Sequence, residues 1–340
     1  LQQFRDWSWQ EYEIMYNEVG IRRSDHNWPE SVFADKMSAV VDEMKAKGLL
    51  VTSQGAQIVD LEAHGLGIAV VIKSDGGTTY LLRDLATYIY RKTQGFNKQL
   101  YVVDVRQSHA LAQTFKILEL LGYIENFQDA VHIAYGFLTL PEGAMSTRTG
   151  TIVGVKDFLD DAGGRALEII EQKNPGLSDK EAVSQMIAKA AIKYFILSRN
   201  LKNDIVFERD NALSFEGNTG PYLQYAHARI NGILRKVGGD GIISVNSESI
   251  LSQPEELAVI RKIHMFPEII ERATEERMPN YLCQYLFELS QTFNTFYEAC
   301  PVSQEPDETI RQTRVALVTA TAQVIKNGLA LLGIEAPPEM

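Results

Sequence analysis

Three short, mainly apolar runs, each followed by a helical or loop segment, most constrain how this chain can fold. The runs are Ile68–Ile72, Leu100–Val103 and Val131–Tyr135. Strands that are apolar along their length and alternate with helices are typical of a parallel sheet covered on both faces. We therefore predict an α/β fold, with helices at about residues 81–93 and 108–121 between the strands.

The residues before this region predict smaller elements. Residues 8–20 and 30–47 have the periodicity of two helices, and Ile58–Leu61 is short and apolar enough for a small strand.

After residue 155 the pattern becomes helical. Ser178–Glu181 has the form of a capping box and predicts the start of a helix. Residues 307–332 predict the last helix, which Gly333 ends. The carboxyl-terminal part is therefore predicted to be an all-α bundle.

Composition limits the possible classes of protein. The chain has 340 residues, 45% of them hydrophobic, which is enough for two or three globular domains and includes no run long enough to cross a membrane. Its two cysteines, Cys283 and Cys300, predict reduced thiols and are too few for a zinc site, so we expect no metal bound by the protein itself. A net charge of -11 excludes general coating of nucleic acid but permits a local basic face.

Polar residues follow the first two apolar runs. Tyr80 and Asp84 are one helical turn apart, and Gln107 follows the second run. Ligands of parallel sheets bind beyond the carboxyl ends of the strands. A phenol, a carboxylate and an amide there suit a cationic ligand such as a guanidinium. An ion pair of Asp84 with Arg83 or Arg91 is an equally good interpretation of the spacing.

Two further features lie in this half of the chain. His109 begins the next helix, where a structural role such as capping is the default and a nucleotide contact the alternative. The loop Gly143–Gly150 combines glycines, hydroxyls and an arginine, which suits a polyphosphate but also an ordinary surface loop. Neither a GxGxxG fingerprint nor a Walker A loop is present.

The stretch Ser214–Arg229 is a Gly-rich loop that leads into a helix. Asn218 and Gly220 lie in the loop, and Tyr222 and Tyr225 lie on one helical face. Exposed tyrosines could stack on unpaired bases, whereas buried ones would belong to the core. Taken alone, the residues of this stretch slightly favour the interpretation that the two tyrosines are buried in the core.

Together these residues resemble the arginyl-tRNA synthetases, which are class I aminoacyl-tRNA synthetases, over essentially the whole chain. The matching segments are Lys73–Gly77, Tyr80–Ala86, Tyr101–Gln107, Met145–Arg148 with Gly150, Glu216–Arg229 and Leu331–Pro337. The resemblance is to the carboxyl-terminal portion of these enzymes. It implies the second half of the class I catalytic domain with a helical insertion at 1–157, a helical connection at 158–204, and an anticodon-binding domain at 205–340.

The resemblance also implies an activity. The complete protein would be a monomeric, cytoplasmic aminoacyl-tRNA ligase that activates L-arginine with ATP and Mg²⁺ and transfers it to tRNA(Arg). The arginine pocket would consist of Tyr80, Asp84 and Gln107. ATP would contact His109, Met145 and Ser146, and a KMSKS-like loop would stabilise the leaving pyrophosphate through Ser146, Thr147 and Arg148. The anticodon would be bound by Asn218, Gly220, Tyr222, Tyr225, Tyr297 and Met340.

The chain departs from the family pattern in two places. The HIGH signature is absent, and Ala144 and Thr149 stand where many members have lysine. We therefore expect this chain alone to be inactive, and a truncated, catalytically inactive tRNA-binding paralogue is the alternative. A different class I synthetase, such as the cysteine enzyme, is disfavoured because its zinc ligands are missing.

Overall fold

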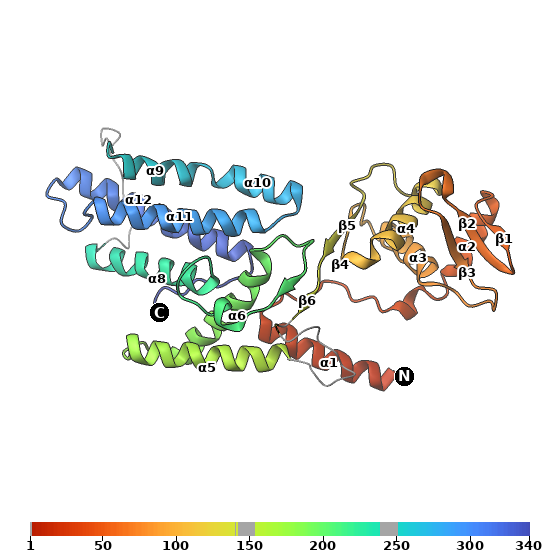
Figure 1. Ribbon diagram of the computed structural model, residues 1–340, viewed down its shortest axis with the longest axis horizontal. Coiled ribbons are helices and arrows are strands. Elements are labelled where there is room, and N and C mark those ends of the chain that lie inside the picture. Colours follow the sequence, from red (N-terminus) through yellow and green to blue (C-terminus); the bar gives the residue numbers. More distant parts are fainter. Residues whose placement is uncertain (1, 140, 142–153, 239–250) are drawn as a thin grey trace. The chain divides into compact units, whose positions relative to one another are not determined.

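The structure of the protein is a computed structural model that describes residues 2–139, 141, 154–238 and 251–340. The chain forms two compact units (Figure 1). Residues 24–137 make up the α/β unit, and the segments on either side of it make up the helical unit. The loop Gly143–Gly150, with Met145, Ser146, Thr147 and Arg148, lies outside the described residues.

The α/β unit begins with short helices and an antiparallel sheet. The elements are η1 (Glu30–Phe33), α2 (Met37–Ala46), β1 (Val51–Ser53), β2 (Ala56–Asp60), η2 (Glu62–His64) and β3 (Ile68–Ile72). The predicted helix over 30–47 is thus split into two. The strands β1, β2 and β3 pair in that order, and all neighbours are antiparallel.

The prediction that β3 belongs to a parallel sheet is wrong. The link from β2 to β3 holds only the one-turn helix η2, and a parallel crossover needs a dozen or more residues. Burial alternates along β3: Ala69 and Val71 are buried, whereas Ile68 and Val70 are about half exposed. Because the residues on the exposed face of β3 are also apolar, the strand has the continuous apolar sequence that is typical of a strand buried on both faces.

The second part of the α/β unit confirms the predicted parallel arrangement. Its elements are α3 (Tyr80–Thr93), β4 (Gln99–Asp104), η3 (Val105–Gln107), α4 (Ser108–Leu120) and β5 (Ala130–Tyr135). The strands β4 and β5 are parallel and in register from Gln99 with Ala130 to Asp104 with Tyr135. Helices α3 and α4 pack on each other and bury Leu82, Leu85, Ile117 and Leu118.

The helical unit is built mainly of helices, as predicted for the chain after residue 155 (Figure 1). These are α1 (Gln2–Val19), α5 (Val155–Lys173), α6 (Lys180–Leu197), α7 (Arg209–Ala212), α8 (Gly220–Val237), α9 (Pro254–His264), α10 (Phe266–Glu276), α11 (Asn280–Ala299) and α12 (Glu308–Leu331). Two short parallel strands, β6 (Leu138–Thr139) and β7 (Ile205–Val206), complete it. None of the helices in the described ranges is long and apolar enough to cross a membrane.

The capping box predicted at Ser178–Glu181 does not form. Helix α6 begins at Lys180 with Asp179 as its N-cap, and no side chain caps it. Glu181 is then the second helical residue rather than the third, and a capping box needs the carboxylate at the third. A capping box is found instead on α9, between Gln253 and Glu256.

Glu256 also belongs to a buried ion cluster that joins α9 and α12. Its Oε1 accepts a hydrogen bond from Arg314 Nε at 2.7 Å, and Arg314 Nη1 lies 2.6 Å from Glu305 Oε2. The side chains of Arg314 and Glu256 are 8% and 2% exposed. Removing Arg314 would leave the Glu256 carboxylate buried without a charge partner, which costs about 3–5 kcal/mol.

Helices α6 and α8 meet at Gly220, the first residue of α8. A Cβ at this position would lie 2.4 Å from the Ala190 carbonyl oxygen and 2.9 Å from Tyr194 Cβ. Only glycine leaves room for this approach of the two backbones.

We expect Gly220→Ala to lower the free energy of unfolding by about 1–3 kcal/mol, because the added methyl group would overpack the contact of α8 with α6. Gly232→Ala is the matched control on the same helix. A Cβ there comes no closer than 3.7 Å, to an arginine side chain, so the substitution should be neutral or stabilising. Denaturant unfolding of the two variants measures the difference, and equal stability would contradict the packing argument.

Candidate functional site

The polar residues predicted to bind a cationic ligand lie on α3 and at the end of β4. Tyr80 and Asp84 are one turn apart at the start of α3, and Gln107 ends the one-turn helix η3 that follows β4. Tyr80 is 74% exposed, and the Arg83 guanidinium lies 5.1 Å from the centre of its ring. Gln107 is exposed. That these three side chains converge on one ligand stays a prediction.

Asp84 is the partly buried member of the set. Burial raises the pKa of its carboxyl group from 3.8 to about 6, and the carboxylate of Glu30 adds to the rise. Arg83 and Arg91 lower the pKa but do not offset the rise. The carboxylate thus lies in surroundings that disfavour its negative charge.

The alternative role for Asp84, an ion pair with Arg83 or Arg91, is not observed among the described residues. Arg83 Nη1 instead lies 2.5 Å from Glu30 Oε2. The Arg91 guanidinium lies 5.9 Å from the centre of the Tyr101 ring. Asp84 thus has no observed ion-pair partner among the described residues.

Asp104 and Arg106 shape the turn that carries Gln107, although neither was predicted to have a role at the site. Asp104 Oδ1 accepts hydrogen bonds from the Arg106 backbone N–H at 2.7 Å and from Arg106 Nε at 2.9 Å. The Arg106 guanidinium lies 3.5 Å from the centre of the Phe137 ring. An aspartate directly after an apolar strand is the signal that could have predicted this turn.

His109 does not cap α4. The helix begins at Ser108 with Gln107 as its N-cap, so His109 is its second residue and is exposed. Its predicted contact with ATP stays a prediction, as do those of Met145 and Ser146 outside the described residues.

Tyr222, Tyr225 and Tyr297 lie together on the helical unit. Tyr225 is 47% exposed, whereas Tyr222 is partly buried and packs edge-on against Phe287 with ring centres 5.6 Å apart. Asn294 Nδ2 on α11 donates a hydrogen bond to the Tyr222 hydroxyl at 3.2 Å. Of the two tyrosines on α8, Tyr222 is thus the one that belongs partly to the core.

Arg229 connects this group of aromatic residues. Its Nη1 lies 3.5 Å from Asn294 Oδ1, and its guanidinium lies 5.6 Å from the centre of the Tyr297 ring. We call the surface formed by Tyr222, Tyr225, Arg229, Asn294 and Tyr297 the tyrosine face. An arginine among aromatic rings is a composition suited to binding unpaired bases.

Asn218 and Gly220 lie at the start of α8, and their observed contacts are within the protein. Asn218 Oδ1 accepts a hydrogen bond from the Tyr194 hydroxyl, and Asn218 Nδ2 donates to Gln284 at 3.3 Å. Asn218 also lines a polar pocket of about 310 Å³ that includes Arg199 and Glu216.

Met340 contacts other parts of the helical unit. Its carbonyl oxygen accepts a hydrogen bond from Asn174 at 3.0 Å, and its side chain packs against a cluster that includes Ile170 and Ile187. The contacts of Asn218, Gly220 and Met340 with a nucleic acid stay predictions.

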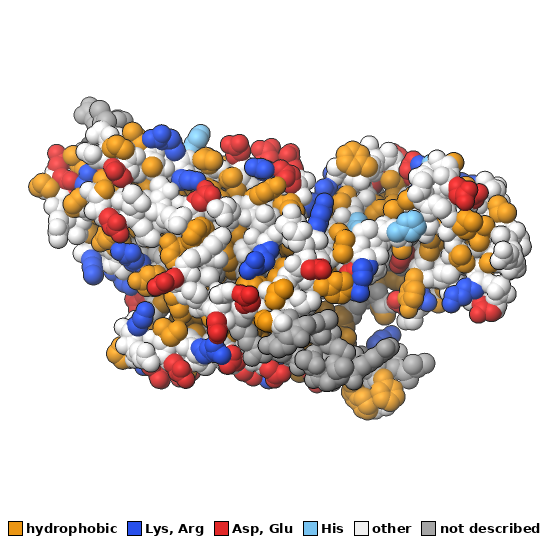
Figure 2. Space-filling model, viewed as in Figure 1, with side chains coloured by type: hydrophobic (Ala, Val, Ile, Leu, Met, Phe, Trp, Pro, Cys, Tyr) orange, Lys and Arg blue, Asp and Glu red, His pale blue; other side chains and the backbone are white. Residues whose placement is uncertain are grey.

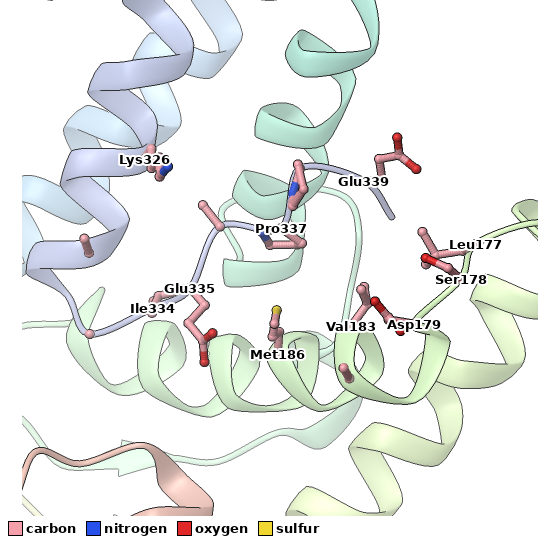
Figure 3. A pocket seen from close by; sticks show the side chains of 15 residues that line it. Leu177, Ser178, Asp179, Val183, Met186, Lys326, Ile334, Glu335, Pro337 and Glu339 are labelled. Atoms are coloured by element: carbon pink, nitrogen blue, oxygen red, sulfur yellow. The ribbon is translucent and has the colours of Figure 1, made fainter. Parts of the chain in front are cut away.

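A larger cavity of about 840 Å³ lies between α6, the end of α12 and residues 333–339. Figure 3 shows Val183 and Met186 pointing from α6 toward this segment. Its lining is mainly apolar and includes the charged residues Asp179, Lys326, Glu335 and Glu339.

Charges of both signs are mixed on the surface. On the face drawn in Figure 2, basic and acidic side chains alternate without a large patch of one sign. This distribution agrees with the net charge of -11 and favours local over general contacts with nucleic acid.

The sequence matches two family models. Residues 1–209 match the model for the class I tRNA synthetase (R) catalytic domain, and residues 223–340 match the DALR anticodon binding domain. Curated relatives are arginine–tRNA ligases. That of Clostridium beijerinckii is 41% identical over 338 residues, which is 99% of this chain and 59% of that protein. That of Streptococcus thermophilus is 41% identical over 341 residues, which is 60% of that protein.

Solved structures give the same result. Thermus thermophilus arginyl-tRNA synthetase has a TM-score of 0.84 and 30% identity, with 96% of this chain and 62% of that chain covered. The enzyme of Plasmodium falciparum has a TM-score of 0.84 and 26% identity, with 100% of this chain and 58% of that chain covered. The chain thus spans about three fifths of the length of the curated relatives it matches.

The raised pKa of Asp84 predicts a stability effect. The folded state holds this proton more tightly than the unfolded state, so the free energy of unfolding falls as pH rises from about 4 to about 6. We expect Asp84→Asn, which mimics the protonated form, to raise the stability by about 1–2 kcal/mol at about pH 7.5, after discounting for partial exposure, and to have no such effect below about pH 4.

Unfolding curves at the two pH values measure this effect. The control is Asp42→Asn on α2, an exposed position in the same unit. A gain for Asp84→Asn no larger than that of the control at the higher pH would refute the argument.

Proposed function

Because this chain belongs to the arginyl-tRNA synthetase family of class I tRNA synthetases, we propose that the protein containing it activates L-arginine with ATP and transfers it to tRNA(Arg). The chain supplies the arginine pocket, the KMSKS-like loop at Met145–Arg148 and the anticodon-binding helices. It acts as a monomer in the cytoplasm in this proposal. Cys283 and Cys300, both buried and free, fit a reducing compartment.

The observation that carries the proposal is the state of Asp84. Its partly buried carboxylate has a raised pKa and no ion pair among the described residues. The guanidinium of arginine carries the missing positive charge and can donate two parallel hydrogen bonds to one carboxylate. The bound substrate would lower the pKa of Asp84 and keep it ionised.

Binding the guanidinium leaves the rest of the substrate free to react. In the first step a carboxylate oxygen of arginine attacks the α-phosphorus of ATP, and the bond to the β-phosphate oxygen breaks to release pyrophosphate. In the second step a hydroxyl of the terminal adenosine of tRNA attacks the carbonyl carbon, and AMP leaves. Asp84 takes part in neither bond change. Its role, with Tyr80 and Gln107, is to select and orient arginine.

Mg²⁺ would reach the site with the nucleotide. Within the ranges that the structure describes, no group of three or more His, Cys, Asp or Glu side chains is arranged to hold a metal ion. Mg²⁺ binds ATP chiefly through phosphate oxygens and keeps several waters, so it needs no complete set of protein ligands.

The tyrosine face supports the proposed binding of tRNA(Arg). Tyr225 and Arg229 are one turn apart on α8 and both are exposed. A ring and a guanidinium on a rigid helix can stack on bases at little cost in conformational entropy. We propose that unpaired anticodon bases bind here.

The exposed apolar side chains of β4 bear on whether this chain could act without the rest of a longer protein. In the described ranges β4 pairs only with β5, and Leu100 and Val102 of β4 are 56% and 61% exposed. These exposed apolar side chains form a surface that further strands or helices of a longer protein would cover. For this reason we propose that catalysis needs the whole protein rather than this chain alone.

The arginine pocket is tested by Asp84→Ala in the complete enzyme. Loss of a partly buried charge partner costs about 2–5 kcal/mol, so we expect arginine affinity to fall by about 30-fold or more. Binding of tRNA(Arg) should be retained. Calorimetric titration with arginine measures the affinity, with Asp42→Ala as the matched control. Arginine affinity equal to that of the control would refute the assignment.

The tyrosine face is tested by separating binding from stability. Tyr225→Ala should weaken binding of tRNA(Arg) by about 5- to 150-fold, since stacking on one base contributes about 1–3 kcal/mol, with the melting temperature unchanged. Tyr222→Ala should lower the melting temperature as well, because it loses the contacts with Asn294 and Phe287. Unchanged tRNA binding by Tyr225→Ala in a filter-binding assay would remove Tyr225 from the interface.

A further inference from the structure

The polar cavity of about 310 Å³ beside the start of α8 has walls from three parts of the helical unit. These are the end of α6, the short helix α7 and the loop Ser214–Thr219. We call this cavity the loop pocket. Most of the residues that line it are polar or charged, whereas the larger cavity beside residues 333–339 is mainly apolar. Its volume is at the low end for ligand sites, so it suits one small polar group.

Most hydroxyl and amide groups of the loop pocket are engaged within the protein. Ser214 Oγ donates to the Glu216 carbonyl at 3.0 Å and accepts from the Glu216 N–H at 3.1 Å. Thr219 Oγ1 donates to the Ser214 carbonyl, and Asn218 Oδ1 accepts from the Tyr194 hydroxyl. These bonds fix the shape of the loop and leave few of its neutral polar groups for a ligand.

Two charged side chains of the loop pocket differ from these groups. Arg199, just after the end of α6, lies with its guanidinium 4.4 Å from the centre of the Phe195 ring. No hydrogen bond or ion pair of the Arg199 or Glu216 side chain is observed in the described ranges, and both residues are exposed. The pocket thus offers one guanidinium and one carboxylate to a ligand.

The aromatic rings that line the loop pocket are not open to a base. Phe195 is 6% exposed and lies under the Arg199 guanidinium, and Tyr194 is 1% exposed. A base therefore has no ring to stack on here, in contrast to the tyrosine face. A sugar-phosphate unit matches the two charged groups better. A phosphate can accept charge-assisted hydrogen bonds from the guanidinium, and the 2′-hydroxyl of ribose can donate to the carboxylate.

The loop pocket lies next to the tyrosine face. Asn218 lines the pocket, and its Nδ2 donates to Gln284 Oε1 of α11 at 3.3 Å. Gln284 lies three residues before Phe287, whose ring packs against Tyr222 of the tyrosine face. An RNA strand with its bases on the tyrosine face would therefore have its backbone within reach of the pocket.

We propose that the loop pocket binds one ribose-phosphate unit of tRNA(Arg), with Arg199 on the phosphate and Glu216 on the 2′-hydroxyl. This inference rests on the proposed function and names a part of the RNA that is bound outside the tyrosine face. Phosphate contacts position a nucleic acid without reading its bases, and the 2′-hydroxyl distinguishes RNA from DNA. The pocket thus sets the register of the anticodon loop on α8 and disfavours deoxyribose.

The phosphate contact is tested in the complete enzyme by measuring the binding of tRNA(Arg) at several salt concentrations. We expect Arg199→Ala to weaken binding by about tenfold at low salt, because a hydrogen-bonded charge contact is lost. The slope of log affinity against log salt concentration should become shallower by about one, since one phosphate fewer is neutralised. Arg199→Lys keeps the charge and should keep the slope.

Arg272→Ala on α10 is the matched control. The Arg272 guanidinium also lies over an aromatic ring, 4.2 Å from the centre of Tyr281, and the variant should keep the wild-type slope. Should Arg199→Ala fail to fold, Arg199→Gln, which keeps a long side chain over Phe195, takes its place with the same expectation.

The ribose contact is tested with anticodon stem-loop RNAs in which the riboses of the loop are replaced by 2′-deoxyribose one at a time. At one position the wild-type enzyme should bind the deoxyribose form about 3- to 10-fold more weakly, because the hydrogen bond to the carboxylate is lost. Glu216→Ala should bind the two forms equally. Glu216→Gln keeps an acceptor oxygen and should keep part of the difference.

Three results would overturn the inference: a wild-type salt slope in Arg199→Ala, an equal loss of slope in Arg272→Ala, or no deoxyribose position that distinguishes Glu216→Ala from the wild-type enzyme. A free amino acid could also pair its carboxylate and ammonium groups with the two side chains, and a pocket that holds one would give the first result. Failure of the proposed function would look different. The wild-type enzyme would then not charge tRNA(Arg) with arginine, whereas the slope of RNA binding would still change in Arg199→Ala.

Discussion

The close approach of α8 to α6 at Gly220 is the contact on which the helical unit depends. Because Gly220 has no side chain, the two backbones touch, and the hydroxyl of Tyr194 can then reach both Asn218 and the carbonyl of Cys283 on α11. The same turn of α6 carries Lys193, which bonds to the ends of α1 and α12. One helical turn thus fixes where four other helices lie, and with them the orientation of the tyrosine face.

Whereas the contact at Gly220 stabilises the helical unit, Asp84 lowers the stability of the α/β unit. A carboxylate there is held partly out of water without an ion-pair partner among the described residues, at a cost to the stability of the unit. Such a cost is expected where a site is shaped for a ligand instead of for the empty protein. The neighbouring cations are already engaged, since Arg83 pairs with Glu30 and Arg91 lies over the Tyr101 ring.

Much of this organisation could be predicted from the sequence, and the failures have physical causes. The bounds of α3, α4 and α12 and of the parallel strands β4 and β5 were predicted nearly to the residue, because the helices are long and each strand is a mainly apolar run between polar segments. The antiparallel pairing of β3 was missed because Ile68 and Val70 are apolar and yet exposed. At the candidate site the spacing of Tyr80 and Asp84 was visible. The pairing of Arg83 with Glu30 was not, since it joins residues far apart in sequence. Glycine at position 220 was expected to allow an unusual backbone angle in a loop, and its role is instead to permit close contact between two helices.

The buried ion cluster of Glu256, Glu305 and Arg314 has a consequence for how this bundle can diverge. Glu256 both caps α9 and pairs with Arg314, which also bonds to Glu305. Substitutions at these three positions are therefore not independent in their effect on stability. Replacing Arg314 alone leaves the Glu256 carboxylate buried without a charge partner, whereas a joint replacement by apolar residues of similar volume is often neutral or favourable. During evolution the three charged residues can therefore be replaced by apolar ones only through less stable variants or by several substitutions at once. The three charged residues would then be retained because the intermediate variants are less stable, whether or not the cluster is the most stable arrangement.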